Sequence, residues 1–256
     1  MPAKLHWLKK WKPIKSVVYS LVGAATYSGI NIVNKLKVNG MEVLKTLPQQ
    51  NVLFVSNHQT YFKDVITLLH IFGAARMGRK NSLGFPLHLL RPFTNLYYVA
   101  AEETMNSGFI SRVLKLAGAI TVHRTWRSNG KDVQQKRNSN DTVKIDEALK
   151  NSWVLSFPQG TTKAFAEGRK GTAHIIKNNH PIVVPIVIDG FNEAFDKKGL
   201  RLKKRGTTLQ VTIKPPLVIN YADTVDNIVE QVMHAIEQSK TYLQLQQKKL
   251  SETMGK

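Results

Sequence analysis

The sequence predicts an α/β fold with a mostly parallel central sheet flanked by helices. Short runs of β-branched and aromatic residues alternate with longer segments whose apolar residues recur at helical spacing, the pattern of repeated strand–helix units. Several strand-like runs are almost continuously apolar, as expected for strands covered on both faces. The chain has 256 residues, 42% of them hydrophobic, which suits one large domain with appendages and a substantial core.

The expected strands are short apolar runs bounded by polar or turn-forming residues. In chain order, a short strand and turn are expected at residues 38–43, and further strands at residues 51–56, 96–100, 119–122, 153–157, 182–188, 209–213 and 217–219. The run at 182–188 is almost entirely apolar around Pro185, and the last two runs flank Pro215 and Pro216.

The expected helices are segments with apolar residues at helical spacing. They cover residues 64–72, 109–116, 141–149, 172–176 and 224–250. Gly118 follows the second helix where glycine commonly ends a helix. In the last helix Ile228, Val232 and Ile236 share one face, so we expect a single C-terminal helix docked on the core. The polar, basic stretch at 125–140 is expected to be a surface loop or a frayed helix.

These elements divide the chain into three parts. Residues 1–45 form a basic and apolar N-terminal helical segment, residues 46–222 the α/β domain, and residues 223–256 the C-terminal helix packed on that domain.

The strongest compositional signal is charge. The chain carries 37 Lys and Arg against 17 Asp and Glu, a net charge of +20, which favours an anionic partner such as nucleic acid, anionic lipid or a phosphorylated substrate. No RNP-type aromatic pair, recognition-helix pattern or zinc module supports a nucleic-acid-binding protein, so we expect no nucleic-acid partner. The absence of cysteine excludes disulfides, a thiol nucleophile and Cys-based metal sites.

The N-terminal segment allows several interpretations. Five lysines and two tryptophans, Trp7 and Trp11, precede residues 16–34, which carry no charge. That stretch is marginal as a membrane span and has no clear signal-peptide cleavage site. We favour an interfacial helix pair on an anionic membrane surface, with lysines near phosphates and tryptophans at headgroup depth. The alternative is a helix that packs on the core.

A candidate catalytic pair follows the strand at 51–56. His58 lies just after the strand and Asp64 begins the next helix. A histidine titrates near neutral pH, and a carboxylate can fix its tautomer and stabilise its cation, which together make a general base. The alternative is a polar turn in which Asp64 only favours the helix start.

Three expected strands end in polar clusters: Asn57-His58, His123-Arg124 and residues 158–162. In α/β sheets, sites assemble at the carboxyl ends of strands, so these clusters reinforce one another. The segments NHQTYFKD, GAITVHR, FPQGTT and IVVPIVI occur in that order between residues 51 and 188. Their order and spacing resemble the four motifs of the membrane-associated glycerolipid acyltransferase family, which contains the 1-acyl-glycerol-3-phosphate acyltransferases.

The resemblance implies transfer of a fatty acyl group from acyl carrier protein or coenzyme A to a lysophospholipid hydroxyl, first of all that of 1-acyl-sn-glycerol-3-phosphate, giving phosphatidic acid. His58 would be the general base and Asp64 its partner. The implied substrate-binding residues are Arg124, Gln159, Gly160, Thr161, Thr162 and Lys163. Backbone N–H groups near Gly160 or at the helix start after His58 could stabilise the oxyanion. No cofactor or metal is implied beyond the thioester co-substrate, and the expected location is the cytoplasmic face of the cell membrane.

The chain also departs from the family pattern. Five residues separate His58 from Asp64, one more than in the family, so the turn must absorb a residue or Asp64 must sit differently. Gln159 replaces the family's Glu, and Thr162 replaces the Arg associated with the acceptor's phosphate. The missing charge could come from Lys163, Arg169 or Lys170. A lyso-lipid with an amino-acid head group, ornithine or glycine, is therefore a competing acceptor.

Overall fold

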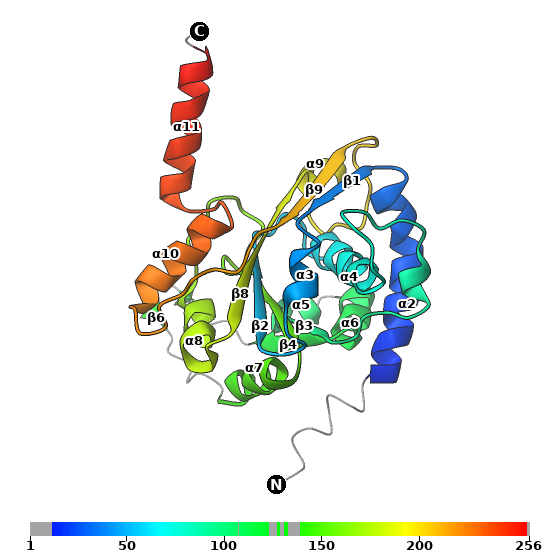
Figure 1. Cartoon of the computed structure of the whole chain (residues 1–256), viewed down its shortest axis with the longest axis horizontal. Helices are drawn as coiled ribbons and strands as arrows, with labels where there is room; N and C mark the ends of the chain where they lie inside the picture. Colours follow the sequence, from blue (N-terminus) through cyan, green and yellow to red (C-terminus); the bar gives the residue numbers. More distant parts are fainter. Residues whose placement is uncertain (1–11, 107, 123–126, 129–130, 133–138, 255–256) are drawn as a thin grey trace.

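The computed structural model describes residues 12–106, 108–122, 127–128, 131–132 and 139–254, and its centre is a seven-stranded sheet (Figure 1). The strand order is β1-β9-β8-β2-β7-β3-β4. The strands are β1 (Lys35–Asn39), β2 (Val52–Ser56), β3 (Leu96–Ala101), β4 (Ala119–Val122), β7 (Trp153–Ser156), β8 (Ile182–Asp189) and β9 (Thr208–Ile213). Within this sheet only the β8–β9 pair is antiparallel, so the predicted mostly parallel sheet is confirmed.

Helices cover both faces of the sheet. One face carries α2 (Lys12–Asn31), α4 (Lys63–Arg76) and α6 (Phe109–Leu116), and the other carries α7 (Ser139–Asn151), α8 (Lys170–Asn179) and α10 (Val225–Ala235). Within β2, Val52 and Phe54 join the hydrophobic cluster on the first face, whereas Leu53 and Val55 join the cluster on the second. Every residue of β2 is buried, because both its faces are covered.

Short elements complete the fold. They are α3 (Val43–Thr46), the 3₁₀ helix η1 (Leu87–Leu89), α5 (Glu102–Met105), α9 (Phe191–Ala194) and a separate antiparallel pair, β5 (Arg127–Ser128) with β6 (Lys131–Asp132). β1 pairs with β9 at one edge of the sheet, so residues 35–39 belong to the central sheet.

The helix α2 packs along the body of the protein, against α4, η1 and α6. Gly23 permits the close approach, because a Cβ there would lie 2.3 Å from Leu89. Lys15 is buried too: its amine donates to the Leu96 carbonyl and lies 3.5 Å from the centre of the Tyr97 ring, and burial lowers the pKa of Lys15 well below its usual value. No helix in the described part of the chain has the length and apolarity needed to cross a membrane. Trp7 and Trp11 lie outside the described residues.

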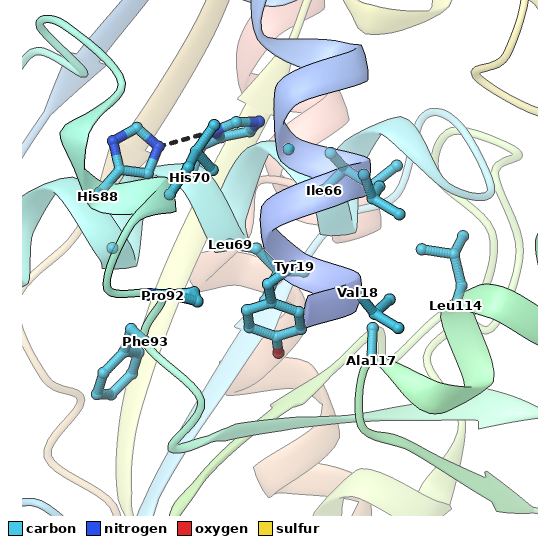
Figure 2. A pocket seen from close by; sticks show the side chains of 14 residues that line it. Val18, Tyr19, Ile66, Leu69, His70, His88, Pro92, Phe93, Leu114 and Ala117 are labelled. Atoms are coloured by element: carbon cyan, nitrogen blue, oxygen red, sulfur yellow. Dashed lines mark hydrogen bonds between the residues drawn. The ribbon is translucent and has the colours of Figure 1, made fainter. Parts of the chain in front are cut away.

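A small apolar cavity lies beneath α2 (Figure 2). Its volume is about 20 Å³, room for about one water molecule, so it is a packing gap and not a substrate site. Two buried histidines on its wall, His70 and His88, are hydrogen-bonded at 2.8 Å. Thr26 donates its hydroxyl proton to the Val22 carbonyl, so its oxygen can accept from Nε2 of His70, at 3.3 Å. Burial and the neighbouring His88 lower the pKa of His70 to about 3. Burial and then the charge of Arg79 lower the pKa of His88 as well, so both rings are neutral at pH 7.

Two expected elements differ in the structure. Residues 217–219 do not form a strand, although Lys214 and Leu217 each donate a backbone N–H to β8. Pro215 and Pro216 between them have no N–H, so a continuous ladder cannot form.

The expected single C-terminal helix is divided into α10 and α11 (Lys240–Met254), and α11 projects from the body of the protein (Figure 1). The helix breaks where Glu237 adopts a left-handed φ of 63°. The Lys214 amine fixes this break, donating to the Ala235 carbonyl at 2.7 Å and pairing with Glu237 at 2.8 Å.

Candidate active site

Two of the three polar strand ends meet at the carboxyl edge of the sheet. β2 and β7 are adjacent and parallel, so His58 after β2 lies beside Phe157 after β7. The two rings stack, with centroids 4.0 Å apart and planes inclined by 22°. His123 and Arg124, the third cluster, lie outside the described residues.

His58 and Asp64 form a hydrogen-bonded pair. Nδ1 of His58 lies 2.8 Å from Oδ2 of Asp64, whose side chain is fully buried. The same carboxylate accepts the backbone N–H groups of Gln59 at 2.6 Å and Thr60 at 2.9 Å, and the Thr60 hydroxyl at 2.6 Å. The turn thus curls around the carboxylate and absorbs the additional residue between histidine and aspartate. Asn57 fixes the other end of the turn by exchanging two hydrogen bonds of 2.8 Å with Ile188 in β8.

A second segment holds this turn from outside. Residues 195–202, which we call the strap, fold back on themselves through a bridge between Phe195 and Leu202. The backbone N–H of Tyr61 donates to the Lys197 carbonyl at 3.0 Å. The N–H of Phe62 donates to the Lys198 carbonyl at 3.1 Å. The turn that carries His58 therefore continues its hydrogen bonding into a loop far along the chain.

Gly199 is the closest point of the strap. Its φ is +75°, and a Cβ there would lie 2.7 Å from Lys63 and 2.9 Å from the Thr60 hydroxyl. The Lys63 amine lies 4.7 Å from the centre of the Phe195 ring. Burial lowers the pKa of Lys63. Burial of Asp196 acts to raise its pKa, but backbone N–H groups within the strap donate to it and bring the pKa below its usual value. Internal hydrogen bonds thus keep the strap in shape against the turn.

Several of the backbone donors considered for the oxyanion are already engaged. The amides of residues 59–62 donate to Asp64 or to the strap, and the amide of Gly160 donates to the Phe157 carbonyl at 2.9 Å. These five amides hold the turn and the loop after β7 in shape.

His58 faces a large cavity at the carboxyl ends of β2, β3, β4 and β7, with a volume of about 1420 Å³. The side chain is 12% exposed, and because Nδ1 is bound to Asp64, Nε2 is the nitrogen available to a substrate. The apolar part of the lining includes Tyr61, Phe62, Val65, Tyr98, Met105, Leu114, Ile145, Phe157 and Ile175. The polar part includes Asp141, Thr161, Glu167, Arg169, Lys170 and His174. In the described part of the chain no three His, Asp or Glu side chains are grouped to hold a metal ion.

The predicted substrate-binding residues separate into two groups. Gly160 and Thr161 line the cavity, whereas Gln159, Thr162 and Lys163 are not in its lining. Gln159 is buried, and its amide donates to the Ala166 carbonyl at 3.1 Å and to the side chain of Gln238 at 3.2 Å. Its observed contacts shape the loop and join it to the segment between α10 and α11.

Two residues of the site were not assigned to it from the sequence. Phe157, which stacks on His58, was taken only as the end of a strand. Arg169 was only one of three cations near the third motif, yet it lines the cavity and its guanidinium lies against Gly160. The signal that could have pointed to Phe157 was its place as the aromatic residue at the start of FPQGTT. For Arg169, the sequence offered only its positive charge.

A histidine–carboxylate pair at the carboxyl edge of an α/β sheet, facing a large and partly apolar cavity, is an arrangement suited to general-base catalysis on a substrate with an apolar part. The model of the Acyltransferase family matches residues 35–189. Because this match spans more than half of the 256 residues, the protein belongs to the acyltransferase family.

Among solved structures, the chain matches the crystal structure of PlsC, the 1-acyl-sn-glycerophosphate (LPA) acyltransferase from Thermotoga maritima. The two are 15% identical with a TM-score of 0.45, and the match covers 91% of this chain and 83% of the other. No curated protein matches the sequence.

Proposed function

We propose that this protein transfers a fatty acyl group from an acyl carrier protein or coenzyme A thioester to the hydroxyl of a lysophospholipid. The acceptor is 1-acyl-sn-glycerol-3-phosphate, and the product is phosphatidic acid. The observation that carries the proposal is the His58–Asp64 pair, held in its turn and facing the cavity, in a chain that belongs to the acyltransferase family.

The chemistry follows from the pair. Nε2 of His58 takes the proton of the acceptor hydroxyl while the hydroxyl oxygen attacks the thioester carbonyl. Asp64 holds Nδ1 protonated and stabilises the imidazolium. The C–O bond forms, the C–S bond breaks, and the proton on Nε2 passes to the departing thiolate. Because a thiolate is a good leaving group, no enzyme nucleophile is required.

The cavity suits a lipid. Phe62, Val65, Met105 and Leu114 give it an apolar wall beside His58. Burying an acyl chain there contributes about 0.8 kcal/mol per methylene, so a long chain can anchor the substrate.

The protein acts on an anionic membrane surface, at the cytoplasmic face of the cell membrane. Exposed apolar side chains gather on neighbouring elements: α2, α6, and η1 with its flanking loop. They are Ile14, Val17, Leu21, Phe85, Leu87, Leu90, Phe109 and Ile110. Exposed basic residues accompany them: Lys12, Arg91, Arg112 and Lys115. Such a surface binds lipid by burying apolar side chains and by attracting anionic headgroups.

Liposome co-sedimentation tests the membrane surface. The triple variant Leu21→Glu, Leu90→Glu, Phe109→Glu should lose binding to anionic vesicles, whereas Val218→Glu, a change at another apolar residue 91% exposed, should not. Equal binding by both variants would place the membrane contact elsewhere.

Acyl transfer is tested with purified protein and one acyl donor, with lysophosphatidate, a lyso-ornithine lipid and glycerol 3-phosphate compared as acceptors. The assay is then repeated with an acyl carrier protein thioester and with a coenzyme A thioester to compare the donors. His58→Ala should lower the rate about 10² to 10⁴-fold. His180→Ala, at an exposed histidine, is the control. Normal turnover by His58→Ala would refute the mechanism, and preference for the ornithine lipid would replace the acceptor.

A further inference from the structure

Side chains in the turn after β2 go alternately in two directions, as side chains do along a strand. His58 and Thr60 bond to the carboxylate of Asp64. Asn57 and Gln59 bond instead to the end of β8 and the start of α9. One side of the turn therefore holds the His58–Asp64 pair, and the other side fixes the turn to the neighbouring strand.

The side chain of Gln59 uses both ends of its amide. Its oxygen accepts the backbone N–H groups of Phe191 at 2.8 Å and Asn192 at 3.4 Å, which open α9 and have no acceptor within that helix. Its nitrogen donates to Oδ1 of Asp189 at 3.1 Å. These neighbours require a donor and an acceptor on one side chain. Glutamate has the same shape but, when ionised, offers acceptors only.

The segment that Gln59 binds is itself held in place. Gly190, between Asp189 and Phe191, has a φ of +80°, and a Cβ there would lie 2.2 Å from the carbonyl oxygen of Thr208 in β9. The side chain of Phe191 is completely buried in the core. The anchor for Gln59 is therefore rigid, and the bonds to it limit where the turn can lie.

The backbone of Gln59 belongs to the site. Its N–H donates to Oδ2 of Asp64 at 2.6 Å, and the same oxygen lies 2.8 Å from Nδ1 of His58. His58 directly precedes Gln59, so one peptide links the two. A movement of Gln59 therefore displaces both members of the pair: His58 through that peptide, and Asp64 through the hydrogen bond.

We propose that Gln59 is a positioning residue for acyl transfer, whose side-chain amide ties the turn to the end of β8 and so keeps Nδ1 of His58 on Asp64 and Nε2 towards the cavity. Gln59 is not part of the cavity lining, so it acts through His58 and does not touch the substrate. The inference rests on the proposed acyl transfer and adds to it the requirement for a donor and an acceptor at this position.

Exchanging donor and acceptor tests the proposal. Gln59→Glu sets a carboxylate against that of Asp189, so kcat should fall about 10-fold or more while KM stays within about twofold, because the lining is untouched. The double variant Gln59→Glu, Asp189→Asn puts the acceptor on residue 59 and the donor on residue 189. It should recover kcat to within about threefold of wild type.

Gln231→Glu is the matched control. Gln231 in α10 is exposed, and its side-chain amide donates to the Val218 carbonyl at 2.8 Å. The variant loses a donor of the same kind far along the chain and should keep the kcat of wild type. A normal kcat in Gln59→Glu would overturn the proposal, and so would a double variant as slow as Gln59→Glu alone.

Nitrogen NMR of ¹⁵N-labelled histidine separates the positioning from the reaction. In wild type His58 should carry its proton on Nδ1, and His58→Ala assigns its signals. Gln59→Glu should shift the ring towards the Nε2–H tautomer, and the double variant should restore it. An unchanged tautomer in Gln59→Glu overturns the positioning role. A wild-type protein with the Nδ1–H tautomer that acylates no acceptor overturns the proposed function instead.

Discussion

Gly199→Ala should reduce catalysis without touching any group in the cavity. The new methyl would lie 2.7 Å from Lys63 and 2.9 Å from the Thr60 hydroxyl, closer than Cβ atoms approach other atoms. Lys63 directly precedes Asp64, and Thr60 donates two hydrogen bonds to its carboxylate. Either the strap withdraws, or the residues that hold Asp64 shift.

The size of the effect has two parts. A residue other than glycine at a φ of +75° costs about 1–2 kcal/mol. If the strap withdraws, the Tyr61 and Phe62 amides lose their acceptors, at about 0.5–1.5 kcal/mol each. The free energy of unfolding should therefore fall by about 2–5 kcal/mol. A displacement of about 1 Å in the pair should lower kcat about 10 to 100-fold.

Steady-state kinetics and denaturant unfolding measure the two parts separately, and Gly206→Ala is the matched control. Gly206 has a φ of +72° near the end of the same loop, but a Cβ there meets nothing within 4 Å. That variant should lose about 1–2 kcal/mol of stability and keep its kcat. If Gly199→Ala also keeps its kcat, the strap does not position the catalytic turn and the reasoning fails.

Three further predictions concern the same framework. Asp64→Asn should lower kcat about 10² to 10⁴-fold, because the neutral amide cannot stabilise the imidazolium; a loss below about 10-fold would contradict this. Gln159→Glu should destabilise the protein by about 1–3 kcal/mol in denaturant unfolding, because the carboxylate would face the side-chain oxygen of Gln238 and a backbone carbonyl; a more stable variant would refute it. In the folded protein the pKa of His70 is lowered from 6.5 to about 3, so at pH 5 the ring takes up a proton only in the unfolded chain. The free energy of unfolding therefore falls as the pH drops below about 6.5. Between pH 7 and pH 5 this amounts to about 2 kcal/mol, which His70→Gln should remove; a His70→Gln protein that keeps the pH dependence of wild type would refute it.

Local pattern was enough to predict the sheet, the order of its strands along the chain and the position of His58. It was not enough for the surroundings of His58, because these come from distant segments. The acceptors for the turn amides lie in the strap, some 130 residues further on, and nothing in the sequence of that basic loop marks such a role.

Contacts with distant segments also decide the surroundings of α2 and of Gln159, which local sequence did not predict. An uncharged stretch such as residues 16–34 suits both a membrane surface and a protein core, and the contact of Gly23 with Leu89 that seats the helix is long-range. Gln159 was grouped with the substrate because of its motif. Its donors are used on carbonyls of its own loop and on Gln238, which only the folded chain brings near.

The position of β2 has a consequence for synthesis of the protein. Val52 in β2 pairs on one side with Trp153 and on the other with Ile182, so the strand that carries His58 has no sheet partner until much later segments leave the ribosome. Such long-range pairing is slow to form, and the early strand stays exposed to wrong partners meanwhile. The strap follows later still, at residues 195–202. The hydrogen bonding of the turn after β2 is therefore complete only when the strap, too, has been synthesised and has folded against it.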